Sequence, residues 1–317
     1  MTRKDAVIAL LLTVLCAVMA LASPQFLSVP NLQNVSRLVG TYGIFSIGVG
    51  FVIVTGGIDL SVGSMCALLG VLLSMMLVEW HWPATVALAA ALIIGAGLGA
   101  AHGVLVTRLR LQPFIVTLCG LLLYRGAARY IARDSTKGFG TGEGFEWVRL
   151  LASGSLGGVP MPFVLLGIVA VAAWLLLHRS VFGRHLVAIG RNEEAARYAG
   201  IRTKAVVAWA YVISGTLTAV SAIIIAFYTN SISPASHGNF YELYAIAAAV
   251  VGGCSLRGGE GSIAGIVMGA ALLQVLRNLV NLLDIPGSLD FAVMGAVILL
   301  GAMADQIVAW RSRGAER

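Results

Sequence analysis

The sequence predicts an all-α fold: a polytopic membrane helical bundle of about ten transmembrane helices, some of them short or broken, with both termini cytoplasmic. Two observations predict it. Hydrophobic residues make up 59% of the 317-residue chain and charged residues only 11%, whereas an ordinary soluble domain has roughly 25% charged residues. The apolar residues also form long runs with few charges, several of them close to the ~20 residues that a helix needs to cross a bilayer. We therefore expect the whole chain, 1–317, to form one transmembrane domain.

Ten charge-poor runs are candidate spans. They lie at 7–22, 38–55, 62–78, 84–106, 111–131, 161–177, 205–228, 241–253, 262–281 and 288–305. The runs at 111–131, 241–253 and 288–305 are short or carry Arg125, Arg129, Glu242 or Asp290. A short or interrupted helix is stable in lipid only where other helices cover its backbone, so we expect these three runs to be interior or re-entrant.

The first run has an alternative interpretation as a cleaved signal peptide. Arg3 and Lys4 precede it, and Ala20-Leu21-Ala22 resembles a cleavage site. Its apolar part is long for a signal sequence, however, and Ser23-Pro24 follows at once. We therefore expect it to be retained as the first helix.

Basic residues between the runs predict the orientation. Four groups share one side when ten spans are counted: Arg3 and Lys4; Arg108 and Arg110; Arg179, Arg184, Arg191, Arg197, Arg202 and Lys204; and Arg311, Arg313 and Arg317. This side is the cytoplasm, where the loop 178–204 would lie, and the main external loop would be 132–160. One group departs from the rule, because the same count places it outside: Arg125, Arg129, Arg133 and Lys137.

Composition also excludes several classes of function. The net charge of +7 would suggest a nucleic-acid partner in a soluble chain, but here the basic residues lie between apolar runs and set orientation instead. The four cysteines form no CxxC pair, so we expect neither a metal site nor a disulfide framework, and we read them as buried small apolar residues. Without a nucleophile–base pair or paired carboxylates, we expect no catalytic residue and no metal in this chain.

The first candidate functional segment is 56–64, Gly56-Gly57-Ile58-Asp59-Leu60-Ser61-Val62-Gly63-Ser64. Paired glycines break a helix, and Asp59 or Ser61 can cap the next one by accepting its free N–H groups. A carboxylate at membrane depth is also a candidate for direct substrate contact. We favour the cap, because it explains the neighbouring glycines too.

The second segment, 252–262, is a Gly-rich turn that echoes the first. Gly252 and Gly253 form its glycine pair, a polar turn follows, and Gly261-Ser262 precedes an apolar run. An internal duplication would explain the echo and would suit a transporter built from repeated halves. The turn lacks the Gly-Lys-Ser/Thr of a phosphate loop, so any ATP used in transport is hydrolysed by another polypeptide.

The third segment, 190–201, predicts a two-turn helix inside the cytoplasmic loop. Asn192 is a suitable N-cap, Glu193 and Glu194 favour the positive end of a helix, and Gly200 is a natural stop. So short a helix is unstable alone and must pack against something. It packs either on the protein's own inner face or into a cytoplasmic partner that transmits movement.

Small residues recur along the runs, as in 95–101 and 261–265. They let helix backbones approach closely and indicate tight packing of the bundle. We expect His102, beside the first of these stretches, to be hydrogen-bonded inside the bundle rather than to act as a ligand.

Taken together, these segments resemble the permease subunits of bacterial ABC importers for ribose and other simple sugars, in the wider family with branched-chain amino acid permeases. The resemblance is carried by four motifs in the family's order: Gly57-Ile58-Asp59-Leu60-Ser61-Val62-Gly63; Pro113-Phe114-Ile115-Val116-Thr117-Leu118 with Tyr124-Arg125-Gly126; the loop from Ala188 to Arg197; and Ala245-Ile246-Ala247-Ala248 with Gly252-Gly253 and Gly261-Ser262. They extend over about 40–300, nearly the whole chain.

The resemblance implies a multi-pass protein of the bacterial inner membrane that imports a ribose-like monosaccharide by alternating access. It implies three protein partners: a second permease copy, identical or homologous; ABC ATPase subunits that carry ATP and Mg; and a periplasmic sugar-binding protein. No cofactor is expected in this chain. The ATPase would contact the coupling loop, with Gly190, Arg191, Asn192, Glu193, Glu194, Ala195, Arg197 and Gly200 as the candidate residues.

The candidates for the translocation pathway or for helix breaks are Gly56, Gly57, Asp59, Ser61, Glu242, Tyr244, Gly252 and Gly253. Similar permeases often have an acidic residue before Ala-Ile-Ala, where this chain has Tyr244, with Glu242 two positions earlier. This departure puts in doubt any role of that carboxylate.

Two alternatives stay open at this point. One is an ABC permease for another small polar solute, such as a branched-chain amino acid or a nucleoside. The other is an ion-coupled secondary transporter, which would be expected to carry several buried acidic groups for coupling. Only Asp59, Glu242 and Asp290 lie in plausible spans, so the second alternative is the weaker.

Overall fold

The computed structural model describes residues 3–140 and 144–284, with single positions at 286, 289, 292, 295, 296, 299 and 303. The helices are α1 (Arg3–Ala22), α2 (Val29–Val54), α3 (Val62–Ser74), α4 (Ala84–Thr107), α5 (Pro113–Ala132), α6 (Glu146–Ser153), α7 (Met161–Trp174), α8 (Val181–Arg191), α9 (Glu193–Tyr198), α10 (Thr203–Thr229), α11 (Tyr241–Val251) and α12 (Ile263–Leu282). A 3-10 turn (Pro24–Leu27) precedes α2, and π-helical turns follow α3 (Met75–Glu79) and α7 (Leu175–Arg179). Two short antiparallel pairs of strands complete the described fold: β1 (Lys137–Gly138) with β4 (Ser231–Ile232), and β2 (Ser155–Leu156) with β3 (Val159–Pro160).

The described residues contain 8 helices long and apolar enough to cross a membrane. Together with the shorter α11 they account for every predicted run except 288–305, which lies largely outside the described residues. The helical bundle is confirmed. α2 begins earlier than its apolar run, because polar side chains in its first turns, such as Asn31 and Arg37, hide the start of the helix from a hydropathy reading.

The weak runs have different outcomes. α11, only 11 residues long, is buried along most of its length, so its interior placement is confirmed. The same expectation is wrong for 111–131, because α5 is a 20-residue helix with only 22% of its span buried. Its charges do not interrupt it. The Arg125 guanidinium donates to the carbonyls of Pro234 and His237 at 2.8 and 2.6 Å, and Arg129 pairs with Asp134 at the end of the helix.

α2 is the central helix, with 89% of its span buried and α7, α10, α11 and α12 packed around it. α4 crosses α10 through glycines four residues apart: a Cβ on Gly95 or Gly99 would collide with α10 at Gly215 or at the Tyr211 backbone. The predicted tight packing is therefore confirmed. His102, only 2% exposed, lies on α4, and its Nε2 is 2.8 Å from the Tyr124 hydroxyl, so its hydrogen-bonded role is confirmed as well.

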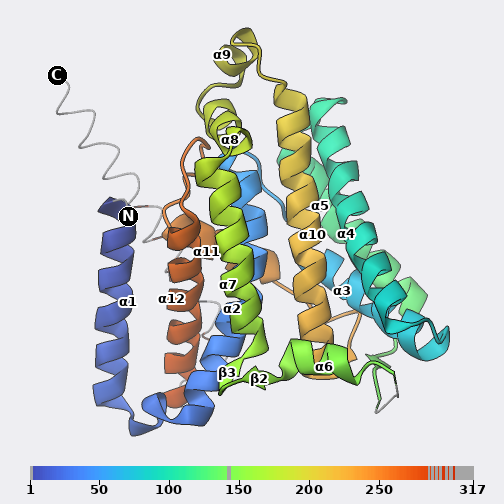
Figure 1. Cartoon of the computed structure of the whole chain (residues 1–317), viewed down its shortest axis with the longest axis vertical. Coiled ribbons are helices and arrows are strands. Elements are labelled where there is room, and N and C mark those ends of the chain that lie inside the picture. The colour runs from blue at the N-terminus through green and yellow to red at the C-terminus, as the bar shows by residue number, and fades with distance from the viewer. Residues whose placement is uncertain are drawn as a thin grey trace.

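The two predicted loops lie at opposite ends of the bundle. Figure 1 shows α8 and α9 at one end, and α6 with the β2–β3 hairpin at the other. Most of the basic residues that break the orientation rule are partnered there: besides Arg125 and Arg129, Lys137 pairs with Glu79 at 2.6 Å. Oxygens that are close in the fold, most of them distant in sequence, pair with these three cations, whereas the orientation rule counts them as free charges.

All four cysteines lie within the described residues and are free thiols. Cys66 and Cys254 are buried and Cys16 is half-buried, but Cys119 is exposed. The expectation of burial is wrong for Cys119, because α5 presents most of its surface outward.

Candidate functional site

The break between α2 and α3 is held by the carboxylate of Asp59. Its Oδ1 accepts from the backbone N–H and the hydroxyl of Ser61 at 3.1 and 2.6 Å, and its Oδ2 accepts from the hydroxyl of Ser214 at 2.8 Å. Ser61 is the N-cap residue of α3, but its side chain makes no capping hydrogen bond. The N–H that donates to Asp59 is that of Ser61 itself and lies before the first turn of α3. The prediction that Asp59 or Ser61 caps α3 by its side chain is therefore wrong. Asp59 instead ties the break to α10, which carries Ser214.

Asp59 has no exposed surface in this conformation. It therefore lines no open path through the chain, and its contact with a substrate stays a hypothesis. Of the glycine pair beside it, Gly56 has a φ of +83°, and a Cβ on Gly57 would lie 2.8 Å from the Tyr211 hydroxyl. The pair thus allows both the turn and a close approach to α10.

The predicted helix of the third segment is present as α9. Asn192 caps it, since its Oδ1 accepts from the Ala195 N–H at 2.9 Å. Glu193 and Glu194 form its first turn, and Gly200 follows its end with a φ of +82°, a conformation that glycine adopts without strain. The cap, the acidic first turn and the glycine stop are all confirmed.

α9 has little contact with the rest of the chain. Ala196 is its only buried residue, and Tyr198 is 83% exposed. The other candidate residues around it are exposed as well: Arg191, Asn192, Glu193, Glu194, Ala195, Arg197 and Gly200. Among the described residues, packing of α9 on the protein's own inner face is therefore limited to one small side chain, and most of the helix surface stays uncovered by them.

The three candidate segments meet at one place, which we call the glycine junction: Val54, Gly56, Gly190, Gly258 and Gly259. The N–H of Gly259 donates to the carbonyl of Val54 at 2.8 Å. Gly190, near the end of α8, lies so close that a Cβ on it would collide with both of these backbone groups. Gly258, in turn, lies against the backbones of Gly56 and Gly190. Thus the end of α8, the end of α2 and the loop before α12 approach one another closely enough for their backbones to touch.

The second segment makes two further contacts, both with Gly265 of α12. A Cβ on Gly252 would lie 2.6 Å from the Gly265 backbone, so α11 and α12 cross closely there. Gly253 follows with a φ of +88°, and Ser262 caps α12 by accepting from the Gly265 N–H at 3.2 Å. The glycines of 252–262 predict a turn, but nothing in their sequence indicates that this turn lies against α8 and α2.

Glu242 and Tyr244 lie apart from the junction, at the start of α11. Each is 8% exposed. The Glu242 carboxylate lies against Gly63 of α3, whereas the Tyr244 ring packs with Tyr42, at 5.7 Å between centroids, and under the guanidinium of Arg277. The structure therefore does not bring these two residues together with the coupling candidates.

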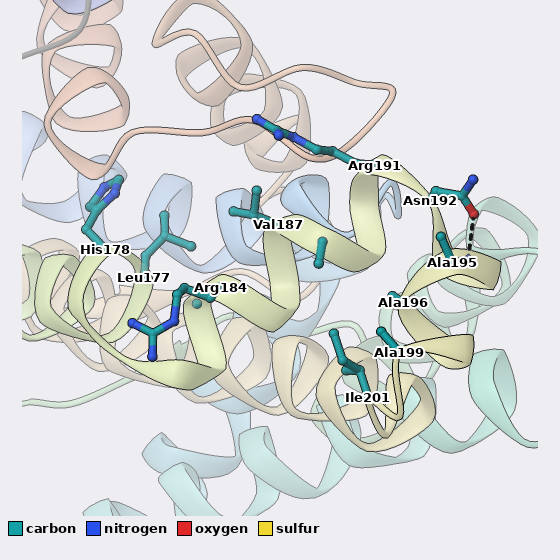
Figure 2. Close-up of a pocket in the computed structure, with 12 residues that line it drawn as sticks. Leu177, His178, Arg184, Val187, Arg191, Asn192, Ala195, Ala196, Ala199 and Ile201 are labelled. Atoms are coloured by element: carbon teal, nitrogen blue, oxygen red, sulfur yellow. Dashed lines mark hydrogen bonds between the residues drawn. The ribbon is translucent and has the colours of Figure 1, made fainter.

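A groove of about 580 Å³ opens between α8 and α9 (Figure 2). Both walls are helix faces with residues three and four positions apart. The α8 wall presents Arg184, Val187, Ala188 and Arg191, and the α9 wall presents Asn192, Ala195, Ala196 and Ala199. Leu177, His178, Gly183 and Ile201 complete the lining. Sequence reasoning missed this groove, although the 3- and 4-residue spacing of both faces was a signal for it.

Residues 31–302 match the family described as "Branched-chain amino acid transport system / permease component". The chain belongs to this family. The permease is thus a multi-pass protein of the inner membrane, which is consistent with its 8 described helices that are long and apolar enough to cross a membrane.

Several relatives are similar to the permease over nearly its whole length. "Ribose import permease protein RbsC" of Escherichia coli (strain K12) is 40% identical over 304 residues, which cover 96% of this chain and 93% of the relative. The protein of the same name from Bacillus subtilis (strain 168) is 38% identical, covering 93% and 90%. "Xylose transport system permease protein XylH" of Escherichia coli (strain K12) is 33% identical, covering 90% and 87%. No solved structure matches the permease.

Proposed function

We propose that this chain is the membrane-spanning subunit of an ATP-driven ABC importer that carries a ribose-like monosaccharide into the cell. The observation that carries the proposal is the 40% identity to a ribose import permease over 96% of the chain. In this proposal the permease has no ATPase site and no cofactor of its own. An ABC ATPase subunit with bound ATP and Mg supplies the energy, a periplasmic sugar-binding protein delivers the sugar, and a second permease copy, identical or homologous, completes the pathway.

The glycine junction gives this function a mechanical route. A push on α9 and α8 reaches Gly190, whose backbone lies against Val54 at the end of α2 and Gly259 before α12. Because Gly190 touches Val54 and Gly259 backbone to backbone, a displacement of α8 is passed directly to these two segments. The break at Asp59, which is anchored to α10 through Ser214, then moves with α2. Alternating access follows if this movement opens one side of the bundle as it closes the other.

The second candidate is a permease for a branched-chain amino acid, which the name of the matched family suggests. The ribose and xylose permeases named above favour a sugar instead. An ion-coupled secondary transporter finds no support among these relatives.

Uptake into proteoliposomes tests the proposal. The permease is reconstituted with the ATPase subunit and the sugar-binding protein, ATP is enclosed on the cytoplasmic side, and labelled ribose, xylose and leucine are compared. We expect uptake of a sugar that stops when ATP, the ATPase or the binding protein is omitted. Uptake by the permease alone, driven by a proton or sodium gradient, would contradict the proposal, and uptake of leucine in place of either sugar would favour the second candidate.

A further inference from the structure

The loop 233–240, which connects β4 to α11, descends into the bundle. β4 follows α10, whose end lies beside α6 (Figure 1). α5 ends near the same place, because β1, which follows it, pairs with β4. Arg125 of α5 donates to the loop carbonyls of Pro234 and His237 at 2.8 and 2.6 Å. Since Arg125 lies about two turns before the end of α5, this part of the loop is about 10 Å below the end of that helix.

α11, which follows the loop, begins near the middle of the membrane. Its 11 residues extend over about 16 Å, about half of the ~30 Å hydrocarbon core. The other end of α11 leads into the turn 252–262, whose Gly258 and Gly259 lie at the glycine junction with α8. The loop 233–240 thus crosses the remaining half of the membrane, on the α6 side, without being helix or strand.

Irregular backbone at this depth cannot face lipid, because its N–H and C=O groups would have no partners in the hydrocarbon. It is stable there only where protein covers it or where it lines a water-filled path. The described residues leave one face of the loop uncovered: Ala235, Ser236, Asn239 and Phe240 are exposed, the last by 46%. Two of these four side chains are polar, so this face borders water, a solute in transit or a second copy of the chain.

Contacts with the rest of the bundle hold the exposed face in a fixed shape. Gly238, with a φ of +75°, packs against the backbone of Gly63 on α3, and the Asn239 amide donates to the Ala235 carbonyl at 3.2 Å. Phe240 has a φ of +64°, a conformation that is strained for an aromatic residue. Such strain persists only where the surrounding structure imposes it, and it is concentrated at ligand sites. The loop thus presents an aromatic ring and two polar side chains in a preorganised arrangement.

These groups suit a neutral monosaccharide. A sugar ring has an apolar face of C–H groups, which packs on an aromatic ring, and hydroxyls, which bond to serine and asparagine side chains. None of the four exposed residues is charged. Glu242 is buried against Gly63, and the Arg125 guanidinium is engaged by carbonyls. A free amino acid would instead need opposite charges to replace the water around its ammonium and carboxylate groups.

We propose that the exposed face of the loop 233–240 contacts the sugar during transport. The Phe240 ring packs on the C–H face of the sugar, and the side chains of Ser236 and Asn239 bond to its hydroxyls. This contact rests on the proposed function, which supplies the sugar. The three residues lie outside the motifs that carry the resemblance. Glu242 and Tyr244, each 8% exposed, do not belong to this face.

Thiol labelling tests whether water reaches the face. Ser236→Cys and Asn239→Cys are made in a Cys119→Ser background, because the native Cys119 thiol is exposed. Ile168→Cys, on the exposed apolar side of α7, is the matched control. Each permease is assembled with its ATPase in nanodiscs and treated with a charged maleimide, with and without ATP. We expect the loop cysteines to react about tenfold faster than the control or more, because the reactive thiolate forms in water and not in lipid.

The same labelling tests for the sugar. Binding protein loaded with ribose or xylose, added with ATP, should slow the reaction of the two loop cysteines. Sugar-free binding protein with ATP should slow it less, and this comparison separates the sugar from simple shielding by the binding protein.

Uptake of ribose and xylose into proteoliposomes tests the contact with the aromatic ring. Phe240→Leu keeps an apolar side chain but removes the ring, and we expect it to lower uptake about twofold to tenfold. Phe240→Tyr, which keeps the ring, should transport as the wild type does. Phe163→Leu, which removes a ring that is 41% exposed on α7, is the control and should leave uptake unchanged. Melting temperatures of all variants show that they fold.

Two results would overturn the proposal. If neither loop cysteine reacts, the face is covered, and a disulfide between two copies through Asn239→Cys would identify the cover as the second copy. If the cysteines react equally with sugar-loaded and sugar-free binding protein, and Phe240→Leu transports normally, the loop borders water without contacting the sugar. Failure of the wild-type permease to take up either sugar, with all its partners present, would instead contradict the proposed function itself.

Discussion

The glycine junction makes a sharp prediction for Gly190→Ala. The added Cβ would collide with the carbonyl of Val54 and the N–H of Gly259, and both are backbone groups that no rotamer change can move aside. Overpacking of this kind costs about 1–3 kcal/mol. If the loop moves away to relieve it, the Gly259 N–H loses its bond to Val54, which costs about 1–3 kcal/mol more where the group stays buried.

The two costs together are about 2–6 kcal/mol, and a loss of about 3 kcal/mol, in the lower half of this range, corresponds to roughly 100-fold in the equilibrium between docked and undocked segments. We therefore expect Gly190→Ala to lower the melting temperature in nanodiscs and to reduce sugar uptake at least tenfold, while ATP hydrolysis by the assembled complex continues.

The matched control is Gly167→Ala on α7. Gly167 is also helical, but within the described part of the chain no other element lies within 4 Å of the position that its Cβ would occupy. We expect this variant to melt and transport as the wild type does, since glycine to alanine in a helix is favourable by about 0.5–1 kcal/mol when no contact is lost. Wild-type uptake by Gly190→Ala, measured beside this control, would refute the role of the junction.

Three further predictions concern the break and α9. Asp59→Asn and Ser214→Ala should each lower the melting temperature, because a hydrogen bond to a charged group contributes about 1.5–3 kcal/mol. If Asp59→Asn abolishes uptake without changing the melting temperature, Asp59 contacts the substrate instead. Gly200→Val should uncouple ATP hydrolysis from uptake and leave membrane insertion intact, because the φ of +82° at this position costs a branched residue about 1–2 kcal/mol. Gly97→Val is the control, since no other described element lies within 4 Å of a Cβ at Gly97. Normal coupling in Gly200→Val would show that the loop only connects two helices. The double variant Glu193→Lys, Glu194→Lys should weaken capture of the ATPase in a pull-down. Its melting temperature should not change, since the exposed Glu194–Arg197 pair at 4.0 Å adds little stability. Undiminished capture would show that these two carboxylates do not contact the ATPase.

Much of the bundle follows from the sequence because the bilayer forces long apolar helices whose backbone bonds are satisfied internally. The features of α9 were also predictable, since a cap, an acidic first turn and a glycine stop act over a few neighbouring residues. The interior position predicted for the run at 111–131 was wrong because Arg125 looks unpaired in the sequence. In the fold, carbonyls more than a hundred residues away accept hydrogen bonds from its guanidinium.

The candidate site was harder to predict, because its parts are distant in the chain. Asp59 is a reasonable cap from its local sequence, but Ser214, 155 residues away, takes one of its oxygens. The three glycine segments were each visible, yet nothing in their composition shows that Gly190 lies against Val54 and Gly259. Small residues indicate that another backbone segment packs closely against them, but only the fold shows which segment it is.

The most direct test of the account is a photocrosslink from α9 in membranes that contain the assembled transporter. A photoreactive residue in place of Tyr198, which is 83% exposed, is compared with one in place of Trp147 on α6, 43% exposed at the opposite end of the bundle. If α9 faces the ATPase, position 198 captures the ATPase subunit and position 147 does not. Capture of the ATPase from position 147 alone, or modification of position 198 by an impermeant reagent added outside the cell membrane, would contradict it.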